Sequence, residues 1–316
     1  MARHTVPDPL EIERVDPQPA FVRPMALSLV LSLRPSQWTK NLIIFLPLIF
    51  AQRLLDVQAV LYAIGAFVIF CGLSGVVYLI NDVADREADR LHPIKQHRPI
   101  ASGALTVPAA IGWAALIGAV SLGAAFWLRP LFGVIATSYV VLLALYSGLM
   151  KHVVILDVLT IAIGFVLRAA AGAVALEVPI SHWLYVLTIL LALFLALSKR
   201  RHELVLLADG ATSHRRILEE YSPYLLDQMI AVVSASTIVA YAFYTVSPET
   251  VQKFGTDRLM LTLPFPLYGI FRYLYLVHQK DGGGSPTDML LNDRPLLLCV
   301  GLWAAAVAFI IYGPTF

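Results

Sequence analysis

Residues 81–103 read NDVADREADRLHPIKQHRPIASG and follow an uncharged apolar run, residues 57–80, without a linker. The apolar run is long enough to cross a bilayer as a helix. If that helix continues, Asp82, Asp85 and Asp89 lie at i, i+3 and i+7 and share one face. Carboxylates stacked at a membrane surface repel one another unless a cation neutralises them, and hard oxygen ligands suit Mg²⁺. The alternative is that these charges only terminate a membrane helix.

The composition of the whole chain predicts an all-α, polytopic membrane protein. Of its 316 residues, 59% are hydrophobic and 14% are charged, and the mean hydropathy is +0.76. A soluble domain of this length does not need so large an apolar fraction. Cys71 and Cys299 both lie in apolar runs, which predicts neither a disulfide framework nor a cysteine metal site. Residues 1–24 are polar and proline-rich and predict a flexible tail, so residues 25–316 form the expected membrane domain.

Hydropathy divides the membrane domain into about nine spans. The backbone must satisfy its own hydrogen bonds in lipid, and the runs lack the alternation of a barrel, so each span is expected to be a helix. Pro47 interrupts the first of them. The expected spans are residues 36–54, 57–80, 107–128, 131–149, 153–176, 182–198, 228–247, 259–278 and 295–313.

Lys and Arg are unevenly distributed between the two sides of these spans. The richer side is expected to be cytoplasmic, so the aspartate cluster faces the cytoplasm. On that side lie Arg3, Arg14, Arg23, Arg34, Arg86, Arg90, Lys95, Arg98, Lys151, Lys199, Arg200, Arg201, Arg215, Arg216, Lys280 and Arg294. The other side has Arg53, Arg129, Lys253 and Arg258.

A basic cluster opens the second long cytoplasmic loop, residues 199–227. It consists of Lys199, Arg200 and Arg201, with Glu203 close behind. One interpretation is structural, because positive charges at a cytoplasmic helix end satisfy the positive-inside rule and the helix dipole. The functional interpretation is an anion clamp facing the aspartates, in which Arg grips phosphate oxygens with its planar fork and Lys acts as a point charge.

Two ionisable residues lie inside one predicted span. Arg168 follows Asp157 by 11 residues, close to three helical turns, so the two share a face. Ionisable residues at membrane depth usually face a protein interior or a wet cavity. Both a functional cavity and a structural ion pair account for this pattern.

The motif NDVADREAD, continuing into RPIASG, resembles the first Asp-rich motif of the UbiA superfamily of intramembrane prenyltransferases. Other segments resemble the branch of decaprenyl-phosphate phosphoribosyltransferases. These are residues 33–50 (LRPSQWTKNLIIFLPLIF), 92–103 (HPIKQHRPIASG), 149–157 (LMKHVVILD), 164–172 (GFVLRAAAG) and 199–204 (KRRHEL). Typical prenyltransferases of the superfamily carry a second Asp-rich motif after the sixth helix. This chain has the basic cluster there, a departure that favours the phosphoribosyltransferase branch.

The resemblance implies Mg²⁺-dependent transfer of 5-phosphoribose from 5-phosphoribosyl diphosphate (PRPP) to a polyprenyl phosphate of the decaprenyl type. It implies that Asn81, Asp82 and Asp85 are catalytic and that Asp82, Asp85 and Asp89 hold the metal. The implied substrate-binding residues are Lys40, Asn41, Lys95, Arg98, Tyr146, Lys151, Asp157, Arg168, Lys199, Arg200, Arg201 and Glu203.

The resemblance also implies a place in the cell. It predicts a multi-pass protein of the bacterial inner (plasma) membrane with a cytoplasmic active site, which makes a precursor for cell-envelope arabinan, as in arabinogalactan. Membrane lipid is an expected partner, a homo-oligomer is compatible with the resemblance, and nucleic acid is not an expected partner. Two alternatives stay open: a UbiA-type prenyltransferase with a prenyl diphosphate donor and an aromatic or lipid acceptor, and a non-enzymatic carrier that uses Asp157 and Arg168.

The predicted orientation can be tested by labelling. A cysteine placed within residues 81–106 or 199–227 should react with an impermeant thiol reagent only when the cytoplasmic side is accessible. A cysteine near Lys253 should react only from the other side, because the two regions are separated by an odd number of predicted spans. Labelling of both positions from one side would contradict the predicted topology.

Overall fold

The computed structural model describes residues 24–208, 216–280, 284 and 286–313, and all regular structure in them is helical. Eight helical segments are long and apolar enough to cross a membrane. They are α3 (Val57–Ala84), α5 (Val107–Leu128), α6 (Pro130–Gly148), α7 (Leu156–Ala175), α8 (His182–Ala208), α9 (Pro223–Val246), η5 (Arg258–Thr262) with α11 (Pro264–Gln279), and α13 (Arg294–Tyr312). The predicted all-α membrane class is confirmed. The tail predicted for residues 1–24 lies, apart from Pro24, outside the described residues.

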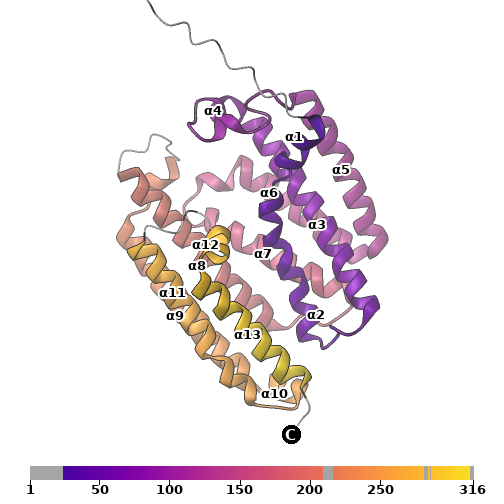
Figure 1. Cartoon of the computed structure of the whole chain (residues 1–316), viewed down its shortest axis with the longest axis vertical. Coiled ribbons are helices and arrows are strands. Elements are labelled where there is room, and N and C mark those ends of the chain that lie inside the picture. Colours follow the sequence, from indigo (N-terminus) through magenta and orange to yellow (C-terminus); the bar gives the residue numbers. More distant parts are fainter. Residues whose placement is uncertain (1–23, 209–215, 281–283, 285, 314–316) are drawn as a thin grey trace, which may run out of the picture.

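The first predicted span is not a single α-helix. It consists of the short helix α1 (Met25–Ser32), the 3₁₀ helix η1 (Pro35–Phe45) and α2 (Leu46–Phe50). Figure 1 shows this indigo segment running from α1 at one end of the molecule to α2 at the other. Arg34 has φ +52° between α1 and η1, and Pro35 and Pro47 supply no backbone N–H. The prediction of about nine spans is therefore met by eight helices and one broken segment that crosses the bundle beside them.

The helices form two halves that meet at α7 and α8. Helices α3, α5, α6 and α7 pack successively against one another, and α8 packs against both α7 and α9. In Figure 1 the indigo-to-magenta half lies opposite the orange-to-yellow half, which contains α9, α11 and α13. The 3₁₀ helix η1 packs against both α3 and α7, so the broken segment is an internal part of the first half.

Short elements gather at one end of the bundle. Because consecutive spans alternate in direction, the connections after α3, α6, α8 and α11 share an end, and the connection after α9 lies at the other. The shared end carries α4 (Arg86–Arg90), η2 (Lys95–His97), η3 (Met150–His152), η4 (Arg216–Glu220) and α12 (Pro286–Asn292). Helix α10 (Pro248–Phe254) lies at the opposite end (Figure 1). The predicted site residues outside the spans are all on the shared end.

One glycine permits the close approach of η1 to α7. A Cβ added to Gly172 would lie 2.2 Å from the carbonyl oxygen of Ile44, a backbone atom that cannot move aside cheaply. We expect Gly172→Ala to destabilise the protein by about 1–3 kcal/mol through overpacking. The matched control is Gly123→Ala on α5, where an added Cβ meets nothing within 4 Å. Thermal unfolding in detergent should show a lower Tm for Gly172→Ala only, and equal Tm values would contradict the close packing.

Candidate active site

Two buried aspartates lie where α3 enters the charged end of the bundle. Asp82 and Asp89 are each 3% exposed, and Arg98 joins them. The Arg98 Nη1 donates to Asp82 Oδ1 at 3.2 Å and to Asp89 Oδ2 at 2.7 Å. Arg34 donates a further hydrogen bond to Asp82 Oδ1. The two carboxylates therefore share a network with two guanidinium groups.

Asp85 does not share the buried face of Asp82 and Asp89. Helix α3 ends at Ala84, Asp85 follows it with φ −90° and ψ +5°, and α4 begins at Arg86. The Asp85 side chain is exposed and makes no ion pair with another described residue. Asn81 is half-buried one residue before Asp82. The prediction that the three aspartates line one face of a continuing helix is met for Asp82 and Asp89 only, because the helix breaks between them.

This donor set fits Mg²⁺ in its usual protein environment. No group of three His, Cys, Asp or Glu side chains suited to a metal is found in the described part of the chain. However, Mg²⁺ typically binds one or two carboxylates and completes its shell with water and substrate phosphate oxygens. Asp82 and Asp89, which share the buried face and are bridged by Arg98, could supply such a pair, and exposed Asp85 lies off that face.

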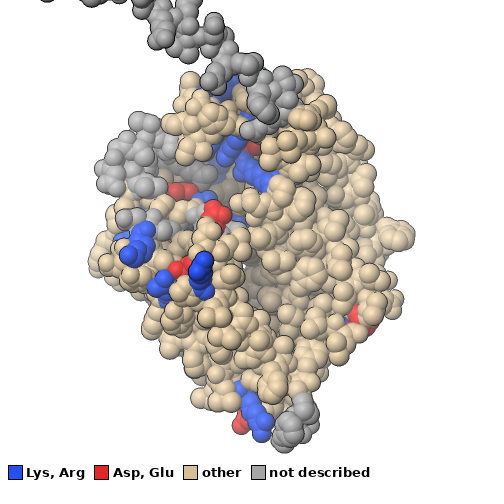
Figure 2. Space-filling model, viewed as in Figure 1, with Lys and Arg blue, Asp and Glu red and all other residues tan. Residues whose placement is uncertain are grey.

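Positive charge gathers opposite the carboxylates, around Lys40. This half-buried residue of η1 lies within the electrostatic reach of Lys199, Arg168 and Arg34, and of one carboxylate, that of Asp288 on α12. Figure 2 shows Lys and Arg side chains with a few acidic groups at a hollow in the upper half of this face, whereas most of the remaining surface is tan. The site therefore combines a carboxylate side with a strongly basic side.

The basic cluster lies on a helix and not in a loop, because α8 continues to Ala208. Consecutive residues of an α-helix point about 100° apart, so three in a row cannot face one cavity. Arg200 is 2% exposed and points to α7, while Arg201 donates to Asp227 Oδ1 on α9 at 2.5 Å. Lys199 is 42% exposed, and its Nζ lies 3.7 Å from Glu203 Oε1. It is the member of the basic cluster whose charge interacts with the charge of Lys40. The expectation of a three-residue clamp is therefore not met by the geometry.

Asp157 is completely buried and is paired with Arg200. Arg200 Nε donates to Asp157 Oδ2 at 2.8 Å, and the Tyr221 hydroxyl donates to Asp157 Oδ1 at 2.8 Å. Burial raises the pKa of Tyr221 to about 12, so this phenol keeps the proton that it donates. Arg200 also donates to Glu203 Oε2 at 2.6 Å and to the Tyr146 hydroxyl at 3.2 Å. This network joins α6, α7 and α8 to Tyr221, in the short connection between η4 and α9.

Arg168 does not pair with Asp157, although both lie on α7. Its Nε donates to Asn41 Oδ1 at 2.8 Å and its Nη2 to the Tyr139 hydroxyl at 2.6 Å. The same guanidinium lies over the Tyr139 ring at 4.7 Å. No carboxylate pairs with Arg168 within the described ranges of the chain. A structural Asp157–Arg168 ion pair is therefore wrong, because each residue has other partners.

Asn41 was expected to bind substrate, and the structure places it in the core. It is 0% exposed, and its Nδ2 lies 3.3 Å from both Cys71 Sγ and Ser74 Oγ. Its contact with Arg168 makes it a support for that cation. Lys95 on η2 and Lys151 on η3 are half-buried at the charged end, as expected from their loops.

Four residues of this region were not among the site residues predicted from the motifs. Tyr139 and Tyr221 hold Arg168 and Asp157, and Tyr78 lies beneath the Arg34 guanidinium at 4.7 Å. Lone tyrosines in apolar spans carry no spacing signal that separates them from core residues. Arg34 was counted only toward topology, although its position just before Pro35 was a signal for a special backbone conformation.

An apolar cavity of about 740 Å³ extends from the charged end between the two halves. Its walls come from α2, α7, α8, α9, α11 and α13, and include the aromatic residues Trp183, Tyr241, Tyr244 and Trp303. Pro286 and Leu290 of α12 line it as well, and so do Glu249 and Lys253 of α10. The cavity therefore runs along the membrane-spanning part of the bundle and offers room for a long apolar chain.

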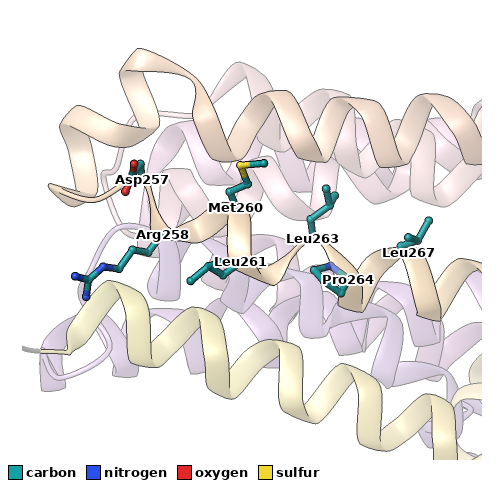
Figure 3. Close-up of a pocket in the computed structure, with 7 residues that line it drawn as sticks. All are labelled: Asp257, Arg258, Met260, Leu261, Leu263, Pro264 and Leu267. Carbon is teal, nitrogen blue, oxygen red and sulfur yellow. The ribbon is translucent and has the colours of Figure 1, made fainter.

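A second pocket, of about 520 Å³, lies along η5 and the start of α11 (Figure 3). Its apolar lining consists of Met260, Leu261, Leu263, Pro264 and Leu267. Figure 3 shows its two charged residues, Asp257 and Arg258, together at one end of the pocket. This pocket follows α10 in the chain and is remote from the carboxylates, so it is not the reaction site.

The comparisons with known proteins agree with this fold. Residues 41–292 match the model of the UbiA prenyltransferase family. The chain is 32% identical over 298 residues to the decaprenyl-phosphate phosphoribosyltransferase of Corynebacterium glutamicum, covering 91% of this chain and 88% of that protein. It is 30% identical over 315 residues to the protein of that name from Mycolicibacterium smegmatis, covering 95% and 97%. A UbiA homolog from Archaeoglobus fulgidus bound to DMAPP and Mg²⁺ has a TM-score of 0.68 at 17% identity, over 90% of this chain and 99% of that one.

The fold and the site are those of a polytopic membrane transferase. The chain belongs to the UbiA prenyltransferase family.

The buried network yields a stability prediction. Arg200→Gln leaves Asp157 buried without its cation, and breaking a buried ion pair costs about 3–5 kcal/mol. The neighbouring Arg201→Gln breaks a partly exposed pair, worth about 1 kcal/mol or less. Thermal unfolding of the two purified variants should therefore show a large fall in Tm for Arg200→Gln alone. Similar small losses in both would mean that the Asp157–Arg200 pair does not support the bundle.

Proposed function

We propose that this protein transfers the 5-phosphoribosyl group of PRPP to a polyprenyl phosphate of the decaprenyl type and releases diphosphate. The observation that carries the proposal is the set of positive charges around Lys40, to which Lys199, Arg168 and Arg34 contribute. Two phosphorylated substrates supply the negative charge that such a site requires. The names of the relatives from Corynebacterium and Mycolicibacterium support the same reaction.

The absence of an acidic motif on α8 favours this donor and acceptor. A prenyl diphosphate held by a second Mg²⁺ would require carboxylates there, but α8 presents Lys199 to the site and uses Glu203 to hold Arg200. A lipid monophosphate can bind to basic side chains without its own metal ion. The polyprenyl tail would occupy the 740 Å³ cavity, whose apolar walls begin below the charged end.

The proposed reaction is a substitution at C1 of the ribose. The bond from C1 to the diphosphate oxygen breaks, its electron pair leaves with diphosphate, and a lipid phosphate oxygen forms the new bond from the opposite face. The product therefore has inverted configuration at C1. The attacking phosphate is already ionised near neutral pH, so a general base is not required.

The chain's own residues contribute mainly position and charge. Asp82 and Asp85 would hold Mg²⁺, which supplies charge neutralisation to the diphosphate when bound. Asn81 would orient these ligands. Asp89 holds Arg98, and Lys95, Arg98 and Lys151 would face the donor from the loops. Lys40 and Lys199 would bind phosphate oxygens across the site.

The location follows from the charge distribution. The site lies at the end that carries most of the Lys and Arg residues, which we propose is the cytoplasmic side of a bacterial inner membrane. The product would be a phosphoribosylated lipid for cell-envelope arabinan synthesis.

A donor assay tests this function. Purified protein given Mg²⁺, labelled PRPP and polyprenyl phosphate should form a charged, labelled lipid, and EDTA should abolish its formation. Asp82→Asn and Asp85→Asn should abolish turnover because each removes a metal ligand. Asp89→Asn should be milder, with a fall of roughly tenfold, because Asn retains an oxygen that accepts the hydrogen bond from Arg98.

The alternative is a UbiA-type prenyltransferase, which the DMAPP-bound neighbour and the apolar cavity bring into consideration. The same protein would then transfer label from a prenyl diphosphate and ignore PRPP. That outcome, or full activity of Asp82→Asn at saturating Mg²⁺, would contradict the proposed reaction.

A further inference from the structure

Arg34 lies at a junction whose backbone is held in an unfavourable conformation. Its φ of +52° and ψ of +66° place it in the left-handed region between α1 and η1. Non-glycine residues persist there only when surrounding contacts determine the position, and such residues cluster at functional sites. Two contacts do so here: the guanidinium donates to Asp82 and lies 4.7 Å above the ring of Tyr78.

Arg34 donates its hydrogen bond to a carboxylate oxygen that also accepts one from Arg98. Asp82 Oδ1 accepts from both Arg34 and Arg98, and a carboxylate oxygen offers about two lone-pair directions. Asp82 is 3% exposed, so water does not compensate its charge, and the two guanidinium groups do. A cation that binds Asp82 through Oδ1, or through both carboxylate oxygens, must therefore displace one of the two arginines, and one bound at Oδ2 alone would still be repelled by both guanidinium charges.

Arg34 is the arginine better placed to leave. Arg98 has a second anchor, because its Nη1 also donates to Asp89 Oδ2 at 2.7 Å, and it would stay at the site even if its 3.2 Å contact with Asp82 were lost. Arg34 has Asp82 as its single carboxylate partner within the described residues, so no second acidic group anchors it, and exposure does not separate the two arginines (27% and 29%). The charge of Arg34 also interacts with that of Lys40, so Arg34 lies near the cations that we propose bind phosphate.

We propose that Arg34 is an internal counter-ion of Asp82 that competes with the divalent cation, and that it moves onto the donor's diphosphate when the cation binds. The donor half of this inference rests on the proposed function. The competition with the cation depends only on the contacts of Asp82. Tyr78 guides the movement, because its ring supports the guanidinium plane while the carboxylate contact is lost.

This role predicts effects of opposite sign on two ligands. Removing the Arg34 charge should strengthen cation binding on the order of tenfold, the scale on which a neighbouring charge shifts a carboxylate equilibrium. The same change should weaken diphosphate binding, on the order of tenfold or more, because a charge-assisted hydrogen bond is lost. A merely structural arginine would weaken both or neither.

The test measures Mn²⁺ binding by electron paramagnetic resonance with the purified full-length chain, first alone and then with inorganic diphosphate. The variants are Arg34→Gln, Arg34→Lys as the charge-conserving form, and Arg86→Gln as a control. Arg86 pairs with Glu87 at 3.3 Å on the same side of the molecule. Arg34→Gln should bind Mn²⁺ more tightly and diphosphate more weakly, Arg34→Lys should fall between it and wild type, and Arg86→Gln should match wild type.

Two other results would overturn the inference in distinguishable ways. If wild type binds Mn²⁺ but Arg34→Gln binds it equally or more weakly, the competition is wrong and the proposed reaction is unaffected. If wild type binds no Mn²⁺ at all, the aspartate metal site fails, and the role of Arg34 fails with it. Should Arg34→Gln not fold, Arg34→Lys gives the same contrast at smaller size, because lysine lacks the planar fork with which arginine binds a carboxylate or a diphosphate.

Discussion

The ion pair between Asp157 and Arg200 joins the two halves of the bundle at the end where the charged side chains gather. Asp157 is 0% exposed and Arg200 2% exposed, so each would be costly to bury without the other. Tyr221 and Tyr146 satisfy further hydrogen bonds of the pair, which brings the connection before α9 and the end of α6 to the same point. With α7 and α8 joined in this way, Lys199 is held within reach of Lys40 on η1. The basic side of the site thus depends on a pair that does not itself face the substrates.

The site brings acidic and basic side chains together in one region. Asp82 and Asp89 contact Arg34 and Arg98, and Lys40, Arg168 and Lys199 add positive charge from η1, α7 and α8. This surplus of cations suits anionic ligands. Arg168 has no described carboxylate partner, and Asn41 and Tyr139 hold its guanidinium in place.

The spans could be predicted from the sequence because uncharged runs of sufficient length have few alternatives in lipid. The ends of the spans were less predictable. Helix α8 continues through its basic residues to Ala208, and this continuation directs Arg200 and Arg201 to different neighbours. The burial of Asp157 followed from its place in an apolar run, but its partner did not, because Arg200 is 43 residues away in the chain. The αL conformation of Arg34 and the contacts of Tyr78 depend on tertiary packing and left no periodic signal in the sequence.

The central claim is that the cations around Lys40 form a site for a phosphorylated sugar donor with Asp82 at the end of α3 and with Asp85 and Asp89 just after it. Equilibrium binding of labelled PRPP to the purified protein tests it most directly, with and without Mg²⁺ and with unlabelled competitors. Saturable binding that requires Mg²⁺, and that inorganic diphosphate displaces more effectively than a prenyl diphosphate does, is the predicted result. Mg²⁺-dependent binding of a labelled prenyl diphosphate, with no binding of PRPP under the same conditions, would contradict the account.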